Sequence, residues 1–226
     1  MTFERQEERY NLLPSDRCDE TNSQHLLILL EPKPVSLQGS RGDVCDTLPD
    51  AAGNHRELLD ALGFALEELS TSSATQAKTV QESSEPRCDI AKKLQLFEGV
   101  RVPVIPVRDY AERLLAHCKA SPVCLIMAYI YISRICKCCN DFVLTPLSMH
   151  RLLLVCTMVA AKFCDDRHYS NALYSKVGGV EVKELNHLEL TVLSVLGFRM
   201  CVKPSELEGC GMYFTTLLQK GAASCP

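Results

Sequence analysis

The apolar positions of the chain repeat at helical spacing in one early segment and again through most of the second half. The early segment is residues 55–69, HRELLDALGFALEEL, in which five leucines fall on one face of a helix. Asn54 stands where its side chain can cap the first turn. The polar stretch 70–88 that follows is expected to be a linker. The pattern therefore predicts an amphipathic helix that is separated by a linker from the rest of the chain.

From residue 106 onward, the apolar positions form a series of helical segments with start and stop signals. Ser121-Pro122 and Thr145-Pro146 each place a capping side chain directly before a first-turn proline. Glycines at 178, 179 and 197 stand where helices are expected to end. The expected helices cover residues 106–118, 122–136, 146–163, 169–177, 181–196 and 203–220.

These segments predict an all-α fold. Residues 123–136, VCLIMAYIYISRIC, are apolar on every side, so this helix is expected to be the central one. The stretch VRVPVIPV, residues 100–107, alternates like a strand, but its two prolines disfavour a place in a sheet. We expect a five-helix bundle around a central apolar helix, with a leading N-terminal helix and a short C-terminal helix. The domain is placed at 55–218, between an acidic, disordered tail at 1–54 and a second tail at 219–226.

Composition and charge narrow the class of protein. The chain has 226 residues, of which 46% are hydrophobic, and a net charge of −4, as expected for a soluble globular protein. Residues 1–87 hold 16 acidic and 8 basic side chains, and the remainder holds 12 and 16. The excess of basic over acidic side chains after residue 87 is too small to indicate a nucleic-acid partner. The longest uncharged apolar run, ASPVCLIMAYIYIS, is shorter than the roughly 20 residues of a membrane span.

The cysteines suggest a reducing compartment rather than a disulfide framework. There are 13 of them, mostly within apolar helical patterns, where a free thiol behaves as a small hydrophobe. The charged start, MTFERQEERY, lacks the apolar core of a signal peptide. We therefore expect the protein in the nucleus, the cytoplasm or both.

Candidate catalytic and metal chemistry is weak. The CKCC stretch at 136–139 could bind zinc together with Cys124 or Cys164, but a second ligand pair at zinc-site spacing is not evident. Asp165 and Asp166 follow a helix end and are interpreted as solvated loop residues or as caps of the next helix, rather than as an acid–base pair. The sequence thus predicts a protein that is not an enzyme and has no metal or cofactor.

Several of these segments, taken together, resemble the cyclin box. They are DYAERLL, SPVCLIMAYIYISR, MHRLLLVCTMVAAKFCDDRHYSNALYSKVGGV and ELNHLELTVLSVLGF, in this order. Their order and spacing are most similar to those of the P/U-type cyclins, the group named for its phosphate-response members. The resemblance covers about residues 55–218 and is most specific between His150 and Val180. It implies a single cyclin box of five helices, preceded by the leading helix at 55–69.

The resemblance also implies a kinase-binding surface. Lys162 ends an apolar run, and a buried ammonium is costly unless it is paired. In the family, the lysine of AAKF and a glutamate of the fifth helix face the kinase, which corresponds here to Lys162 and Glu189. The partner of Lys162 is therefore expected on another protein, and Phe163 and Leu193 are expected to add apolar contacts. The simpler alternative is that Lys162 extends to water and that Glu189 is merely exposed.

One position departs from the family pattern. Cyclins typically pair an arginine of the first helix with an aspartate that precedes the arginine of the second helix. Here these positions correspond to Arg113, Ser133 and Arg134, so the aspartate is replaced by a serine. We expect the ion pair to be missing or rerouted to Asp109. Together with the glycines at 178 and 179, these three residues are expected to have structural roles.

By this resemblance, the protein is expected to be a regulatory subunit. It would bind and activate a cyclin-dependent protein kinase as a heterodimer and act in the cell cycle or in nutrient and phosphate signalling. The main alternative is a cyclin-box scaffold that binds a partner without activating a kinase. A metal-binding helical protein and an unrelated hydrolase are weaker alternatives.

Overall fold

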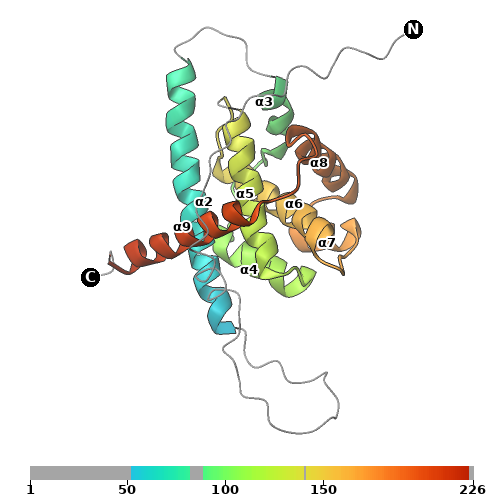
Figure 1. Cartoon of the computed structure of the whole chain (residues 1–226). Helices are drawn as coiled ribbons and strands as arrows, with labels where there is room; N and C mark the ends of the chain where they lie inside the picture. Colours follow the sequence, from blue (N-terminus) through green and yellow to red (C-terminus); the bar gives the residue numbers. More distant parts are fainter. Residues whose placement is uncertain (1–51, 82–88, 140, 224–226) are drawn as a thin grey trace, which may run out of the picture.

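The computed structural model describes residues 52–81, 89–139 and 141–223, and within these ranges it contains helices and no strand (Figure 1). The all-α fold class is therefore confirmed. The expected disorder of residues 1–51 lies outside the described residues. The elements are α2 (Ala52–Gln81), α3 (Asp89–Leu94), η1 (Gln95–Phe97), α4 (Val107–Cys118), α5 (Pro122–Cys138), α6 (Pro146–Cys164), α7 (Asn171–Gly178), α8 (Val182–Val195) and α9 (Pro204–Ala223).

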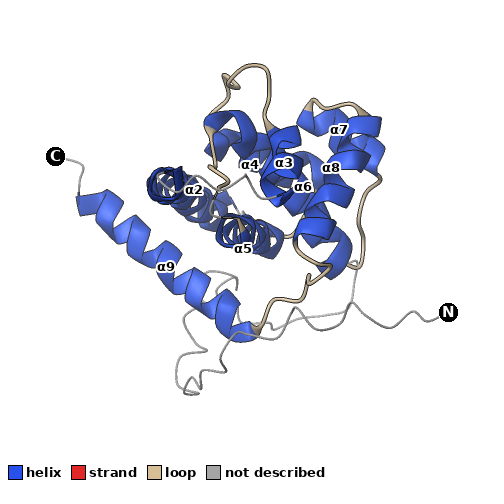
Figure 2. Ribbon diagram, turned by 90° about the horizontal axis from the view of Figure 1, so that it is seen from above, coloured by secondary structure: helices blue, strands red, loops and turns tan. Residues whose placement is uncertain are grey.

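The five helices α4 to α8 form the predicted bundle, and α5 and α6 pack together along its middle. Helix α5 lies between α6 on one side and the pair α2 and α9 on the other (Figure 2). Helix α6 packs against α4, α5, α7, α8 and η1. Of its 19 residues 13 are buried, whereas 10 of the 17 residues of α5 are buried. The central place expected for residues 123–136 is thus shared with α6, which is the more completely enclosed helix.

The enclosure of α6 accounts for its composition. It is the one helix in the described part of the chain that is long and apolar enough to cross a membrane, with a mean hydropathy of 1.4. However, 72% of the apolar window is buried inside the protein. A helix that is apolar on all sides is the expected element at the centre of a bundle.

The leading helix is longer at both ends than the sequence predicted. It begins at Ala52, so Asn54 lies in its first turn and not before it, and residues 52–54 do not belong to the tail. It also continues through most of the supposed linker 70–88, to Gln81. The Ser70 hydroxyl donates to the Leu144 carbonyl at 2.6 Å, and the buried Ser73 hydroxyl accepts the Leu144 N–H at 3.0 Å. The linker prediction is therefore wrong for residues 70–81, where these serines bind the backbone of a distant loop, and residues 82–88 lie outside the described residues.

The C-terminal helix is also longer than expected. Helix α9 has 20 residues and reaches Ala223, so the tail predicted at 219–226 is helical over 219–223. Its buried side chains, Phe214 and Leu217, face α2 and α5. The Tyr213 hydroxyl donates to Glu68 of α2 at 2.7 Å. A second unpredicted element is the pair α3 and η1, which buries Leu94 and Phe97.

The predicted starts of α5 and α6 and the predicted end of α7 agree with the structure. Helices α5 and α6 begin at Pro122 and Pro146, directly after Ser121 and Thr145. The Thr145 N–H donates to the Ser148 hydroxyl at 3.1 Å, as in a capping box. Helix α7 ends at a glycine pair, of which the second, Gly179, has a left-handed φ of 70° and donates its N–H to the Ser175 carbonyl. This conformation suits glycine because it has no Cβ.

Candidate functional site

Lys162 lies in the last turn of α6 and forms an ion pair with Glu189, in the middle of α8. The distance from Lys162 Nζ to Glu189 Oε1 is 2.6 Å, and the side chains are 27% and 14% exposed. The partner of Lys162 is therefore present in the chain itself, and the expectation that it belongs to another protein is wrong. The alternative in which Lys162 extends to water and Glu189 is exposed is also wrong, because the two side chains bind each other and most of their surface is buried.

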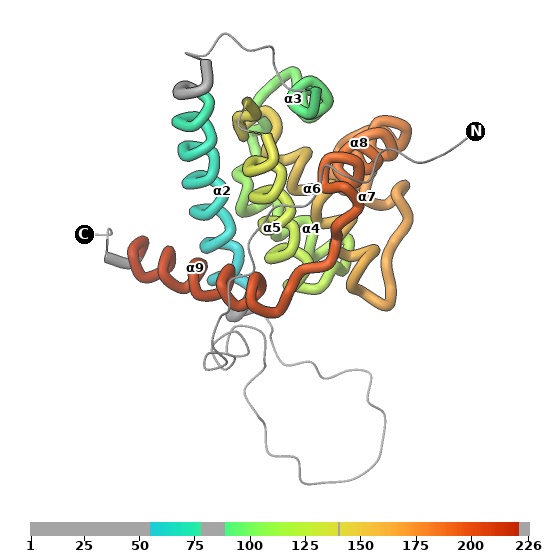
Figure 3. Tube along the Cα trace, turned by 45° about the horizontal axis from the view of Figure 1, so that its top comes forward, coloured from blue at the N-terminus to red at the C-terminus, as the bar shows by residue number. Residues whose placement is uncertain are grey.

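A third helix holds the other oxygen of the carboxylate. The Asn171 amide, at the start of α7, donates to Glu189 Oε2 at 2.8 Å and to Asn186 Oδ1 at 2.7 Å. The charged group of Lys162 and the amide of Asn171 thus hold Glu189 from two sides. This network fixes the ends of α6 and α7 to the middle of α8, and these helices lie together on one side of the molecule (Figure 3). The roles of Asn171 and Asn186 were not predicted.

Large apolar side chains are exposed beside this ion pair. Phe163 follows Lys162 and is 54% exposed, and Leu190 follows Glu189 and is 62% exposed. Leu193, one turn after Glu189, is half-buried against the core. The structure thus places all four predicted kinase-binding residues on neighbouring turns of α6 and α8. Leu190 was not predicted as a binding residue, although its position directly after Glu189 could have indicated it.

Phe198 is a further apolar residue near the end of α8. It is 69% exposed, and its φ of 57° lies in the left-handed region, where non-glycine residues are uncommon. Its N–H donates to the Leu193 carbonyl at 2.9 Å, which closes the helix end. Phe198 thus adds exposed apolar surface directly after α8.

Asp165, which directly follows α6, has a structural role. Its carboxylate accepts the Ser121 hydroxyl at 2.7 Å and the Ser121 N–H at 3.1 Å. The Cys124 thiol also donates to it, at 3.3 Å. The carboxylate therefore lies at the N-terminus of α5, where the helix dipole favours negative charge. The interpretation of Asp165 as a solvated loop residue or a cap of the next helix is wrong, whereas Asp166 is exposed.

The ion pair that is typical between the first and second helices of a cyclin box is missing between the described helices α4 and α5, which is one of the two outcomes expected from Ser133. Arg113 is exposed on α4 and makes no hydrogen bond or ion pair within the described residues, and Asp109 pairs instead with Arg108, at 3.1 Å. The reason is the packing: α4 contacts α2, α6 and α7, so its outer side does not face Ser133. The rerouting to Asp109 is therefore wrong.

Arg134 of α5 is held by the C-terminal part of the chain. Its Nη2 contacts both carboxylate oxygens of Glu206 of α9, at 2.8 and 2.9 Å, and its guanidinium donates to the Arg199 and Cys201 carbonyls, each at 3.1 Å. This arginine thereby fixes the loop between α8 and α9. The position of α9 thus depends on Arg134 rather than on Ser133.

The nine cysteines in the described part of the chain do not gather with other ligands into a candidate metal site. Within the described ranges, three or more His, Cys, Asp or Glu side chains do not gather in any place that could hold a metal ion. Cys136 and Cys139 of the CKCC stretch are buried, whereas Cys138 is exposed. Burial raises the pKa of Cys124 and of Cys136 to about 12, so both stay protonated as thiols at neutral pH. Cys136 therefore packs as a small apolar group, whereas the Cys124 thiol also donates to Asp165.

The described residues thus form an all-helical bundle whose third and fifth helices, α6 and α8, are joined by an ion pair. The family model described as Cyclin matches residues 56–200, and the chain belongs to the cyclin family. The predicted resemblance to P/U-type cyclins is confirmed by the curated relatives. Cyclins are regulatory proteins, and the matched family is not a catalytic one.

Three relatives illustrate the similarity. The chain is 43% identical over 111 residues to Cyclin-U1-1 of Arabidopsis thaliana, covering 49% of this chain and 53% of the relative. It is 39% identical over 132 residues to Cyclin-U4-1 of the same plant, covering 57% and 65%. It is 42% identical over 118 residues to Cyclin-P3-1 of Oryza sativa subsp. japonica, covering 52% and 48%. The matched part thus spans about half to two thirds of the length of these relatives.

Proposed function

We propose that the protein binds and activates a cyclin-dependent protein kinase through the surface formed by α6 and α8. The observation that carries the proposal is the Lys162–Glu189 ion pair flanked by the exposed side chains of Phe163 and Leu190. Exposed apolar side chains that lie beside polar groups are typical of protein-binding surfaces. Membership in the cyclin family supports a kinase as the partner.

The chemistry of this surface suits a helical segment of the kinase. The pair and Asn171 fix the position of Glu189 before the partner arrives, so little ordering is required on binding. The lysine ammonium and the glutamate carboxylate retain hydrogen-bonding capacity for backbone groups of the partner. Phe163 and Leu190 supply apolar area, and a few such anchors carry most of the binding energy in protein interfaces.

Activation of the kinase would follow from a shift in the populations of its active and inactive conformations. A cyclin surface that binds the active arrangement of the kinase better than the inactive one increases the fraction of active kinase. In the active arrangement, the glutamate of the regulatory helix pairs with the lysine that holds ATP phosphates. The proposed complex is a heterodimer located in the nucleus, the cytoplasm or both, and its output is cell-cycle control or nutrient and phosphate signalling.

The test is affinity purification of the tagged full chain from its own cells, with identification of bound proteins and a kinase assay on the eluate. Phe163→Asp and Leu190→Asp place a charge on exposed positions, so the fold should tolerate both. We expect each to reduce kinase recovery and kinase activity at least several-fold. Met212→Asp is the matched control, because Met212 is also exposed (46%) but lies on α9.

The outcomes separate the two main functions. A kinase recovered in stoichiometric amount with activity that falls in both interface variants supports activation. A stoichiometric but inactive complex would establish the scaffold function in place of activation. Recovery of the kinase that is equal in Phe163→Asp, Leu190→Asp and Met212→Asp would show that α6 and α8 are not the binding surface.

A further inference from the structure

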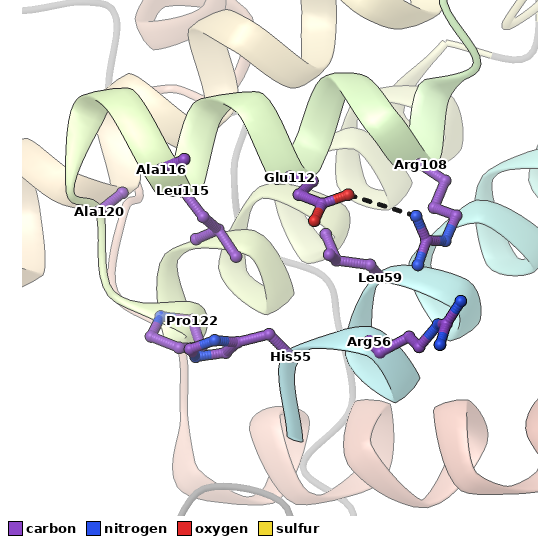
Figure 4. A pocket seen from close by; sticks show the side chains of 9 residues that line it. All are labelled: His55, Arg56, Leu59, Arg108, Glu112, Leu115, Ala116, Ala120 and Pro122. Carbon is purple, nitrogen blue, oxygen red and sulfur yellow. Dashed lines mark hydrogen bonds and ion pairs between the residues drawn. The ribbon is translucent and has the colours of Figure 1, made fainter. Parts of the chain in front are cut away.

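A cleft of about 580 Å³ opens between the first turns of α2 and the helix α4 (Figure 4). Leu59 of α2 forms one wall of it. The opposite wall is apolar as well, and it comes from the end of α4 and the turn into α5, through Leu115, Ala116, Ala120 and Pro122. None of the residues that line this cleft belongs to the proposed kinase-binding surface.

The rim of the cleft offers one cation, Arg56, that no carboxylate of the described residues neutralises. His55 and Arg56 lie on the α2 side, and Arg108 and Glu112 lie on the α4 side. Glu112 is paired with Arg108, at 3.3 Å, as the dashed line in Figure 4 shows. Arg108 also pairs with Asp60 and Asp109. Arg56 is exposed and forms no hydrogen bond or ion pair with another described residue. The cleft therefore suits an apolar segment that is followed or preceded by carboxylates.

The chain itself contains a segment of this kind. Residues 1–51 hold ten acidic and five basic side chains, and within them LLILL, residues 26–30, forms a run of five large aliphatic residues. Acidic residues flank this run, with Glu20 before it and Glu31 directly after it. Residues 1–51 lead directly into α2, whose first turns form one wall of the cleft.

The connection is long enough for the segment to reach the cleft. Residues 31–54, which join the LLILL run to His55, can span at most about 80 Å when fully extended. A segment tethered in this way is present at an effective concentration on the order of millimolar. Modest affinity is therefore sufficient for it to occupy the cleft for most of the time.

We propose that residues 26–31 bind in this cleft of their own chain. The LLILL run lies against the apolar wall formed by Leu115 and Ala116, and a flanking carboxylate meets Arg56. In this arrangement, the N-terminal segment competes with any partner peptide of the same chemistry. The cleft thus becomes available to a partner only when the N-terminal segment is displaced.

The experiment uses the full chain with the photo-crosslinking residue p-benzoylphenylalanine in place of Ile28. After illumination, the crosslinked peptides are identified by mass spectrometry. We expect crosslinks to residues 55–59 and 112–122 within the same chain, which a mixture of isotope-labelled and unlabelled protein distinguishes from crosslinks between chains. The same probe at Leu37, in the polar stretch after the run, should give these crosslinks only at background level.

A matched pair of variants tests the cleft itself. Ala116 and His117 are neighbours on α4 and both are exposed, so a glutamate at either position should leave the fold intact. Ala116→Glu adds a carboxylate to the apolar wall and should reduce the crosslink yield from position 28 several-fold. His117→Glu adds the same charge outside the cleft and should leave the yield unchanged.

Three results would overturn the proposal: crosslinks from position 28 to other surfaces, crosslinks only between two chains, or a yield that Ala116→Glu does not lower. The second result would indicate that a second copy of the protein occupies the cleft. Kinase recovery with Phe163→Asp is measured separately, so failure of this proposal is distinguishable from failure of the proposed function.

Discussion

Lys162 and Glu189 form an ion pair that joins α6 to α8, and Asn171 of α7 holds the second oxygen of the same carboxylate. The pair is largely enclosed, and removal of one charge from such a pair leaves the other without compensation. Lys162→Glu should therefore lower the free energy of unfolding by about 2 kcal/mol, because it places two carboxylates together. Urea denaturation of the purified chain measures this change.

The exchanged pair Lys162→Glu with Glu189→Lys is the control for this prediction. It restores the opposite charges across α6 and α8, so the stability should recover in large part. If the pair serves only the fold, kinase recovery should return as well. If it also contacts the kinase, recovery should stay low, because the charges that face the partner are reversed. Equal stability of Lys162→Glu and the unmodified chain would contradict the first part of this prediction.

Ser73 should contribute more to stability than its place in a polar segment suggests. Its side chain is buried, and its hydroxyl accepts the Leu144 N–H and donates to the Ser70 carbonyl. Ser73→Ala leaves the Leu144 N–H unpaired in the interior, at a cost of about 1–2 kcal/mol. Thermal or urea unfolding measures the loss.

The matched control for Ser73 is Thr75, two residues further along α2. Its hydroxyl donates only to the Thr71 carbonyl one turn earlier, on the exposed side of the helix. Thr75→Ala should therefore be neutral or slightly stabilising, since alanine has the higher helix propensity. A loss of stability as large in Thr75→Ala as in Ser73→Ala would show that the contact with Leu144 is not the cause.

The difference between Ser73 and Thr75 also explains why half of α2 was not predicted. The sequence shows both as members of a polar stretch, and polar stretches with serine and threonine favour loops. The helix persists there because Ser70 and Ser73 bind the backbone of Leu144, more than 70 residues away. By contrast, the starts of α5 and α6 were predicted because Ser121-Pro122 and Thr145-Pro146 are local signals.

The contacts within the candidate site were likewise not predictable from local sequence signals. The sequence identified Lys162 and Glu189 through family resemblance, but it did not show that they bind each other, because the helices that hold them cross only in the folded chain. Nor could it show that Asp165 reaches Ser121, or that Arg113 points away from α5. Each of these contacts depends on packing between helices, which helical periodicity leaves undetermined.

Gly178 should resist substitution even by alanine. A Cβ at this position would meet the side-chain carbons of Leu154, a fully buried residue of α6, so α7 would have to move away. Gly178→Ala is expected to cost about 1–3 kcal/mol, as overpacking of a core does. The neighbouring Gly179 has open space around it, so Gly179→Ala should cost only about 1 kcal/mol, from its left-handed backbone.

A second variant separates the clash at Gly178 from a change in helix propensity. Leu154→Ala on its own should destabilise the chain by creating a cavity. Combined with Gly178→Ala, it should cost less than the sum of the two single changes, because the smaller side chain gives room to the new Cβ. Additive costs in this double-mutant cycle, measured by urea denaturation, would contradict the proposed contact.

His150 should make the stability of the chain depend on pH in the mildly acidic range. Its ring lies in the core beside Tyr110, Nε2 contacts the Ile105 carbonyl at 2.8 Å, and Nδ1 is buried without a hydrogen-bond partner. Burial lowers the pKa of this imidazole in the folded state, despite the hydrogen bond to Ile105, which acts in the opposite direction. Protonation therefore favours the unfolded chain.

The stability supplied by neutral His150 is accordingly complete above the pKa of an unfolded histidine, about 6.5. It falls as the pH decreases below that value, until the lower pKa of the folded state is reached. His150→Gln can donate the same hydrogen bond to Ile105 but does not titrate. Between about pH 7.5 and pH 5, the unmodified chain should lose more stability than this variant in urea denaturation. Parallel losses in the two proteins would show that His150 does not stay neutral in the fold.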